Sequence, residues 1–181
     1  PYQAFKVIHG IGYSKFFQTI EDIESELTNF VSASDPVEIF ELKLTNQSAE
    51  TRKLDVTSYV EWLLGFAPDE HREFHKLFID TSANVGASTL YARKYLWGFP
   101  DDKGRYNNID WPYTAFMAVS EPVKSLDCDK ESFIGMYRND DRPQAMLDSE
   151  LAGRSGRFTD AIAALHMQVT LAPGEVKNIV F

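Results

Sequence analysis

Short apolar runs of strand type recur along this sequence at a spacing of roughly ten residues, and turn residues separate them. The run from 56 to 64 shows the pattern, because Val56, Val60 and Trp62 fall at even positions and would share one face of a pleated strand. Hardly any stretch has the pattern of a helix. The sequence therefore predicts an all-β fold, a large antiparallel two-sheet β-sandwich with little helix.

The predicted strands follow from these runs. They lie at 5–8, 23–31, 37–46, 56–64, 90–96, 113–120, 165–171 and 176–181. The strand at 37–46 carries large apolar residues at odd and even positions, which predicts burial on both faces or a bulge near Phe40. Polar turns at 46–52 and 172–175 predict antiparallel hairpins between the strands that flank them.

The remaining segments predict one short helix and two loops. The helix is expected at 129–136, with Asp129 as its N-cap. A structured loop with large exposed rings is expected at 97–112, and irregular chain at 137–158. The whole length of 181 residues fits a single domain, residues 1–181.

Net charge and cysteine content limit the partners and the cellular location that we expect for this chain. The net charge of -9 argues against binding nucleic acid, which needs a local surplus of Lys and Arg. The single cysteine, Cys128, cannot form an internal disulfide, and neither a signal peptide nor a membrane-spanning run is present. We therefore expect a soluble cytoplasmic protein without a membrane partner.

The two ends of the sequence also support an expectation. The first residue is Pro1 rather than an initiator Met, and the last residues, VKNIVF, stop within an apolar run. Both features predict that the chain is a piece of a longer protein.

Motifs of known catalytic chemistry are nearly absent. The sequence has no GxSxG elbow, no phosphate loop and no HExxH helix. His71 and His75 are four residues apart, but a zinc site needs at least three protein ligands, so surface histidines are favoured and no metal is expected. Glu61 lies opposite the core residues of its strand, which favours exposure or pairing with a cation of a neighbouring strand over catalysis. We name no catalytic residue and no cofactor.

Candidate binding residues gather in two segments. Arg72, His75 and Lys76 belong to a dense polar segment after Gly65, where the cations could bind phosphate or sugar hydroxyls, or could balance the acids beside them. Trp97 and Trp111 belong to an aromatic cluster with Phe99, Tyr106 and Tyr113. Flat rings beside Asp, Asn and Arg are suited to holding sugars, and an interface or a secondary core is at least as well supported by the composition.

Five segments, taken in order, resemble a known family. They are HGIGYSKF at 9–16, DPVEIFELKLTN at 35–46, TRKLDVTSYVEWLLG at 51–65, DKESFIGMYRNDDRPQA at 129–145 and LAPGEVKNIVF at 171–181. Together they resemble the N-terminal β-supersandwich domain of the inverting phosphorylases of glycoside hydrolase family 94. That group includes the cellobiose, cellodextrin and chitobiose phosphorylases and the phosphorylase-like part of cyclic β-1,2-glucan synthases.

The resemblance implies a function for the whole protein and an accessory role for this chain. It implies reversible phosphorolysis of a β-linked disaccharide or oligosaccharide to a sugar 1-phosphate, with inorganic phosphate as co-substrate and nucleophile. Because phosphate itself is the nucleophile, one carboxylic acid is enough for catalysis, where an inverting hydrolase needs two carboxylates. In the family this acid belongs to a following (α/α)6 barrel, so this fragment alone would not be an enzyme. The sandwich would supply homodimer contacts and accessory sugar-site residues.

One position departs from the family pattern. Lys76 falls where cellobiose-type members carry an Arg, and an ammonium is a point charge in place of a bidentate fork. Two rival interpretations stay open on the sequence alone. One is a stand-alone carbohydrate-binding module, and the other is a purely structural dimerisation domain.

Overall fold

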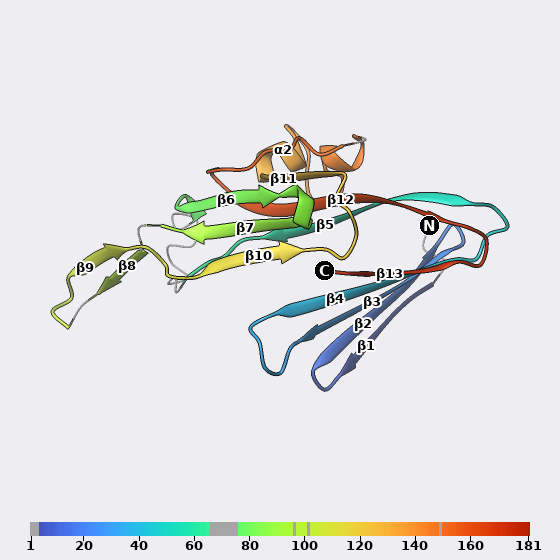
Figure 1. Ribbon diagram of the computed structural model, residues 1–181, viewed down its shortest axis with the longest axis horizontal. Helices are drawn as coiled ribbons and strands as arrows, with labels where there is room; N and C mark the ends of the chain where they lie inside the picture. Colours follow the sequence, from blue (N-terminus) through green and yellow to red (C-terminus); the bar gives the residue numbers. More distant parts are fainter. Residues whose placement is uncertain (1–3, 66–75, 96, 101, 149) are drawn as a thin grey trace. The chain divides into compact units, whose positions relative to one another are not determined.

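The computed structural model describes residues 4–65, 76–95, 97–100, 102–148 and 150–181. Side chains are described for these residues except 4, 97–100 and 106–109. The fold is an all-β sandwich of antiparallel strands, as predicted, and helix occurs in the described residues only as short segments (Figure 1). The described chain divides into two compact units. Unit 1 consists of Pro1–Val56, Val119–Glu121 and Gln168–Phe181, and unit 2 of Thr57–Ala118 and Pro122–Met167.

Unit 1 is built on a five-stranded sheet in the order β1-β2-β3-β4-β13 (Figure 1). Its strands are β1 (Ala4–Gly10), β2 (Tyr13–Ile20), β3 (Ile23–Val31), β4 (Glu38–Asn46) and β13 (Val176–Val180). The first part of the chain therefore holds three strands where the apolar runs predicted two, because β2 places Phe16 and Phe17 on opposite faces and has few other apolar residues. The register of β3 with β4 runs past Phe40 without a shift, so the bulge considered there is absent.

One face of this sheet carries the apolar side chains. The register places Val7, Phe16, Leu27, Leu42 and Ile179 in one row across the five strands, with side chains on the same face. Exposure grows along the strand order: Ile179 is fully buried, the middle strands are half-buried, and Phe5 at the β1 edge is exposed.

Unit 2 contains two three-stranded sheets and a two-stranded hairpin. The first sheet has the order β10-β7-β6, with β6 (Ile79–Asn84), β7 (Thr89–Lys94) and β10 (Thr114–Ala118). The second has the order β11-β12-β5, with β5 (Arg52–Glu61), β11 (Ser125–Asp129) and β12 (Ala161–Leu171). Both β5 and β12 begin in one unit and end in the other. The hairpin joins β8 (Trp97–Pro100) to β9 (Tyr106–Ile109), so part of the loop predicted at 97–112 is strand.

Side chains join the two sheets of unit 2 and cover the outer face of one of them. The Ser58 hydroxyl of β5 meets the Met117 sulfur of β10 at 3.9 Å. On the other face of β12, Ile162 and Ala164 pack in a cluster with Phe133, Ala145 and Leu151. Because both of its faces are covered, β12 is buried at every position from 161 to 167.

The described helices are short, and side chains cap two of them. α2 (Lys130–Ile134) has Asp129 as N-cap, whose carboxylate accepts the Glu131 amide at 3.1 Å, as the sequence predicted. The 3-10 turns are η2 (Val85–Ala87), capped by Asn84, and η3 (Gln144–Met146). The segment at 137–158 is otherwise irregular, also as predicted.

Both predicted hairpins are wrong in their pairing. The turns at 46–52 and 172–175 exist, but β4 pairs with β13 and β5 lies beside β12. Each turn therefore carries the chain from one sheet to another. Asn46, which is fully buried, fixes this crossing point through its amide, which donates to the carbonyls of Glu50, Leu171 and Ala172 at 2.8–3.1 Å.

Candidate functional site

Two of the five predicted binding residues, Lys76 and Trp111, have side chains that the structure describes. Trp97 opens β8 and pairs with Ile109, and its side chain lies outside the described part. Arg72 and His75 lie outside the described residues altogether. The candidate site is therefore built from Lys76 and Trp111 outward.

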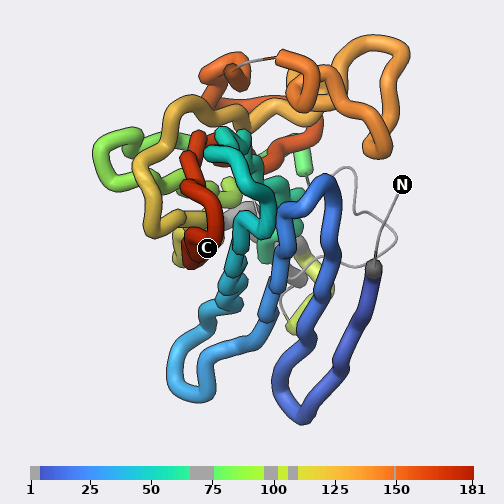
Figure 2. Tube along the Cα trace, turned by 90° about the vertical axis from the view of Figure 1, so that its right-hand side faces the viewer, coloured from blue at the N-terminus to red at the C-terminus, as the bar shows by residue number. Residues whose placement is uncertain are grey.

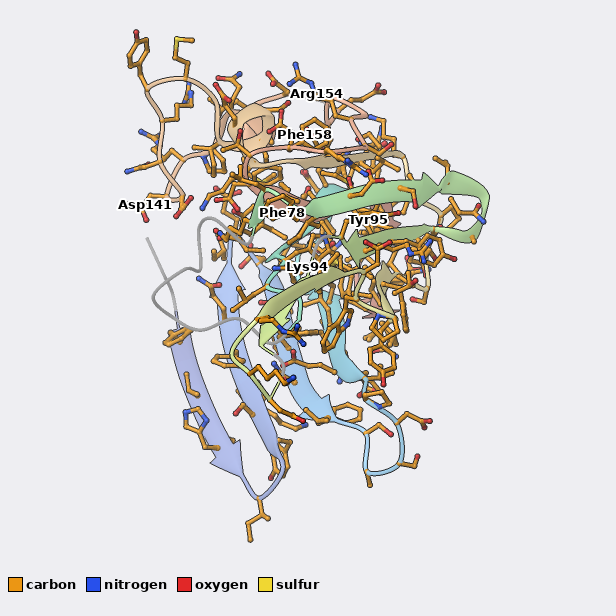
Figure 3. All side chains as sticks on the ribbon, turned by 90° about the vertical axis from the view of Figure 1, so that its left-hand side faces the viewer. Phe78, Lys94, Tyr95, Asp141, Arg154 and Phe158 are labelled. Atoms are coloured by element: carbon orange, nitrogen blue, oxygen red, sulfur yellow. The ribbon has the colours of Figure 1, made fainter. Side chains whose placement is uncertain are left out.

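Lys76 and Trp111 are brought to the same end of the β10-β7-β6 sheet. The Tyr95 amide donates to the Phe78 carbonyl at 2.9 Å, which extends the β6–β7 ladder beyond Ile79. The Trp111 amide donates to the Lys94 carbonyl at 3.0 Å. Figure 3 shows Phe78, Lys94 and Tyr95 at this end. Trp111 and the chain that follows Lys76 are thus both tied to this end of the sheet.

The aromatic residues of this end are only partly exposed. The rings of Trp111 and Tyr113 meet edge to face with centroids 5.4 Å apart. Trp111 is half-buried, whereas Tyr113 is 66% exposed. Tyr95 lies under the guanidinium of Arg157, 5.0 Å from the ring centroid, and is half-buried. An interface and a sugar site both remain compatible with these rings.

Lys94 is the most deeply buried cation among the described residues. Its side chain lies on the inner face of β7 and the residue is 1% exposed. Burial lowers the pKa of its ammonium to about 8, because the charged form loses its hydration. The carbonyl of the same residue accepts the Trp111 amide, so Lys94 has a buried side chain and a backbone contact to Trp111.

Lys76 belongs to an ion cluster, which we define as Tyr59, Glu61, Lys76, Lys130 and Asp160. The Lys76 ammonium donates to Glu61 Oε2 at 3.1 Å and to Asp160 Oδ1 at 2.8 Å. The Lys130 ammonium donates to Glu61 Oε1 at 2.6 Å and lies 3.7 Å from Asp160 Oδ2. The Tyr59 hydroxyl donates to Glu61 Oε1 at 3.0 Å. Two ammonium groups and two carboxylates thus compensate one another.

The hydrogen bonds of the cluster hold its groups in their charged forms. The bond from Lys130, together with those from Lys76 and Tyr59, lowers the pKa of Glu61 to about 2 against the opposing effect of burial. Burial works against the charge of Lys76, but the bonds to Asp160 and Glu61 outweigh it and raise its pKa. The bond to Glu61 raises the pKa of Lys130 as well. The Tyr59 phenol has a raised pKa through burial and its bond to Glu61.

These pKa shifts define what the ion cluster can do. Glu61 is ionised at any pH above about 2, so it is not a proton donor near neutrality. Lys76 is protonated and two of its N–H groups are bound to carboxylates, so it is not a nucleophile. The cluster instead fastens residue 76 to the end of β5 and to Asp160, just before β12.

Sequence reasoning singled out two of the five residues of this cluster, Glu61 and Lys76. It expected Glu61 to be exposed or paired with a cation of a neighbouring strand; the cations come instead from Lys76 and from Lys130, the first residue of α2. Tyr59, Lys130 and Asp160 were not singled out. A signal existed only for Lys130, which directly follows the predicted N-cap, whereas Asp160 is far from Glu61 in sequence.

Two further features of the described residues concern metals and membranes. Within the part of the chain that the structure describes, no three His, Cys, Asp or Glu residues come together as a metal site would require. His71 lies, with His75, outside that part. Among the described residues, no helix has the length and apolar character needed to cross a bilayer.

Comparison with protein families decides the affiliation of the chain. The model of the glycosyl hydrolase 94 supersandwich domain matches residues 1–181. The chain belongs to this family. A family-94 relative, the cyclic beta-(1,2)-glucan synthase NdvB of Rhizobium meliloti (strain 1021), is 29% identical over 98% of the chain and 6% of the relative.

Two phosphorylases are similar over nearly the same span of this family-94 domain. The solabiose phosphorylase of Paenibacillus borealis is 27% identical over 94% of the chain and 21% of the relative. The N,N'-diacetylchitobiose phosphorylase of Vibrio proteolyticus is 25% identical over 94% of the chain and 20% of the relative. The chain thus spans about a fifth of these phosphorylases and much less of the glucan synthase.

Proposed function

We propose that this family-94 domain is the N-terminal part of an inverting glycoside phosphorylase. The intact enzyme would carry out reversible phosphorolysis of a β-linked disaccharide or oligosaccharide, such as cellobiose, to a sugar 1-phosphate. The single observation that carries the proposal is the family match over the whole chain, joined to phosphorylases among the relatives. The chain covers only about a fifth of those relatives, which leaves room for a separate catalytic part.

The chemistry divides between the two parts in this proposal. Inorganic phosphate attacks the anomeric carbon, and a single carboxylic acid of the catalytic (α/α)6 barrel protonates the leaving sugar. The domain described here supplies accessory residues at the edge of the sugar site and contacts in a homodimer. The charged state of Glu61 supports this division, because the carboxylate best fixed in the described residues is not a proton donor.

In this proposal, the main role of Lys76 is to hold the neighbouring chain in place. Its ammonium is held by Glu61 and Asp160, which fixes the chain where the segment with Arg72 and His75 ends. Trp111 is fixed in turn through the Lys94 carbonyl. Arg72, His75, Lys76, Trp97 and Trp111 remain our proposed substrate-binding residues.

The first experiment tests the reaction itself. The intact enzyme is incubated with inorganic phosphate and, in separate reactions, cellobiose, N,N'-diacetylchitobiose and related β-linked disaccharides. We expect one of them to yield a sugar 1-phosphate of inverted anomeric configuration, detected by NMR. Absence of a sugar phosphate from all of them would remove the proposal.

The second experiment tests the role of Lys76 by comparing two variants of the intact enzyme. Lys76→Ala removes the proposed substrate-binding ammonium, whereas Lys130→Ala opens the same ion cluster without touching a proposed substrate-binding residue. A direct contact predicts a rise in KM for the sugar with Lys76→Ala alone, and a purely positioning role predicts similar rises with both. Unchanged kinetics in both variants would favour a structural dimerisation domain.

The remaining rival is a stand-alone carbohydrate-binding module. Calorimetry of the 181-residue chain against cello-oligosaccharides separates the two, because an accessory edge without its catalytic part should bind too weakly to detect. Measurable binding by the chain alone would favour the module. Sedimentation of the intact enzyme tests the homodimer.

A further inference from the structure

The segment between α2 and β12 carries an unusual concentration of exposed apolar side chains. We call residues 135–148 the 135–148 loop. Tyr137 is 99% exposed and Met136 is 76% exposed, and Met146 and Leu147 are exposed as well. Figure 2 shows this segment, in orange, as an open loop that leaves the body of the chain. Apolar side chains gathered in this way usually mark a contact surface.

The base of the 135–148 loop is anchored in the core of unit 2. Phe133, just before the loop, and Ala145, near its end, pack in one cluster with Ile162 and Ala164 of β12. The Gly135 amide donates to the Glu131 carbonyl at 2.9 Å, which closes α2. Gly135 is also required by close packing, since a Cβ there would lie 2.6 Å from Cβ of Gln144. Both ends of the loop are therefore held in place.

The tip of the loop has a defined backbone conformation. The amides of Arg138 and Arg142 donate to the carbonyls of Gly135 and Asn139 at 3.3 Å and 3.2 Å. Tyr137 adopts φ +62°, a left-handed conformation that costs free energy for a bulky residue. Strain of this kind persists only where the surrounding structure holds it, and it often occurs at functional sites; here it presents a ring that is 99% exposed.

The shape of the tip favours a protein partner over a sugar. Sugar and other small-molecule sites are concave and bury most of their ligand, whereas Tyr137 is almost fully exposed. A protruding aromatic residue with Met and Arg beside it has the composition of a hot spot that enters a pocket of a partner. Arg138 and Arg142 supply the charged surroundings of such an anchor.

The size of the tip favours a partner that is covalently linked. A stable interface between separate proteins uses about 20–30 residues on each side, many more than this tip offers. A partner in the same polypeptide needs less contact area, because linkage gives it a high effective concentration. Such a partner exists if the proposed function is right, since the phosphorylase relatives are about five times as long as this domain.

The loop also lies near the ion cluster. The charge of Asp140 contributes to the raised pKa values of Tyr59 and Lys130. Figure 3 places Asp141 well apart from Arg154 and Phe158, which lie nearer the body of unit 2. The loop follows directly after α2, whose first residue, Lys130, belongs to the ion cluster.

We infer that the 135–148 loop is a preformed docking element whose anchor, Tyr137, inserts into an apolar pocket of the catalytic part of the same enzyme. This inference rests on the proposed function for the existence of that catalytic part. The loop would then fix the position of the Lys76 region against the sugar site. A second copy of the chain and a free sugar are the other occupants that the experiment distinguishes.

Thiol labelling in the intact enzyme tests the docking directly. Cysteine is introduced at Met136, beside the anchor, and at two reference positions, Val85 of η2 and Ile11 of the β1–β2 turn, which are 58% and 103% exposed. Maleimide labelling of each site is followed by mass spectrometry of its peptide. Docking predicts that Met136→Cys reacts at least about tenfold more slowly than both references, because each 1.4 kcal/mol of closure slows access about tenfold.

A second substitution identifies Tyr137 as the anchor. In the double variant Met136→Cys/Tyr137→Gly, labelling should return to the reference rate, because glycine keeps the backbone conformation and removes the ring. Equal rates at Met136 and the references overturn the inference, and so does protection that survives Tyr137→Gly. Protection that is lost when the enzyme is diluted would point to a second copy of the chain. Protection that requires added oligosaccharide would point to a sugar. Either result overturns the inference.

The outcome is distinguishable from that of the phosphorolysis assay. Labelling rates do not depend on turnover, so a protected Met136→Cys in an enzyme without phosphorolysis would uphold docking and remove the proposed reaction. Fast labelling in an active phosphorylase would remove docking alone. A double variant that folds but labels fast should also show a raised KM for the sugar if the loop positions the Lys76 region.

Discussion

The ion cluster and the 135–148 loop belong to the same compact unit and are joined through α2. They differ in whether their side chains are paired within the chain or exposed to solvent. In the ion cluster, each of four charged groups meets an opposite charge within 4 Å. In the loop, the ring of Tyr137 is almost wholly exposed. Glu61 and Lys76 are therefore compensated internally, whereas the exposed tip of the loop is apolar.

The contrast separates two ways in which an accessory domain can serve a catalytic partner. A compensated cluster contributes rigidity, because its ion pairs hold separate segments together. Its charges are already neutralised, so it attracts a further ion weakly. An exposed anchor on a fixed loop contributes binding, because it loses little entropy when it docks. The predictions below test whether the two regions are as different as their contacts indicate.

The largest effect is expected where the base of the loop is most crowded. Gly135→Ala combines a φ of +84° with a Cβ 2.6 Å from Cβ of Gln144, so it should lower the free energy of unfolding by about 3 kcal/mol. Gly153→Ala is the matched control, because Gly153 has φ +75° but open space around it, and about 1 kcal/mol is expected there. Urea denaturation of the 181-residue chain measures both. Equal losses would show that the loop base is not tightly packed.

The next effect concerns the ion cluster. Glu61→Ala leaves the ammonium groups of Lys76 and Lys130 with Asp160 alone, so we expect a loss of about 2 kcal/mol in the free energy of unfolding. Glu21→Ala is the control, since Glu21 is largely exposed and lies 3.6 Å from Arg52; its loss should stay below about 0.5 kcal/mol. Similar losses in the two variants would mean that the cluster is an ordinary surface network.

The local parts of the fold were predictable from the sequence, but the strand pairing was not. Alternation of apolar residues placed β5, β7 and β12, and Asp129 was correctly identified as the cap of α2. Polar turns predicted two hairpins, and both are wrong because β4 pairs with β13 while β5 lies beside β12. A turn shows where a strand ends, whereas its partner depends on distant contacts such as those made by the buried amide of Asn46.

The candidate site shows the same limit. The residue types around Lys76 indicated charge compensation or ligand binding, and the sequence could not decide between them. The deciding partner, Asp160, is far along the chain and stands in an unremarkable loop, so neither period nor spacing links it to Lys76. The 135–148 loop was predicted as the end of a short helix followed by irregular chain, and part of it as a family-like segment, but not as a docking element. Exposure and a positive φ at Tyr137 are properties of the folded backbone.

A smaller effect is expected in the pH dependence of stability. The pKa of Glu61 is lowered from 4.5 to about 2, so its charged form stabilises the fold above pH 4.5 and this contribution is lost as the pH falls from 4.5 to 2. The full shift corresponds to roughly 3 kcal/mol, and the one-third exposure of the side chain reduces it to about 1–2 kcal/mol. Urea denaturation of the unmodified chain and of Glu61→Gln at about pH 6 and pH 3 should show a stability difference that shrinks at low pH.

This comparison reports on Glu61, because the two proteins differ in that side chain alone. A difference that stays constant between the two pH values would mean that Glu61 is not held ionised by Lys76 and Lys130. Such a result would remove the distinction between the compensated cluster and an exposed charged surface.

The smallest effect concerns the anchor itself in the 181-residue chain. Because Tyr137 is 99% exposed, its ring should add almost nothing to stability, and Tyr137→Ala should be close to neutral. Tyr137→Gly relieves the left-handed strain at φ +62° and should be more stable than Tyr137→Ala by about 0.5 kcal/mol, the strain relief being partly offset by the entropy of glycine in the unfolded chain. Thermal and urea unfolding compare the two. If both variants lost more than about 1 kcal/mol, the ring would be part of the fold and could not be an anchor held ready for a partner.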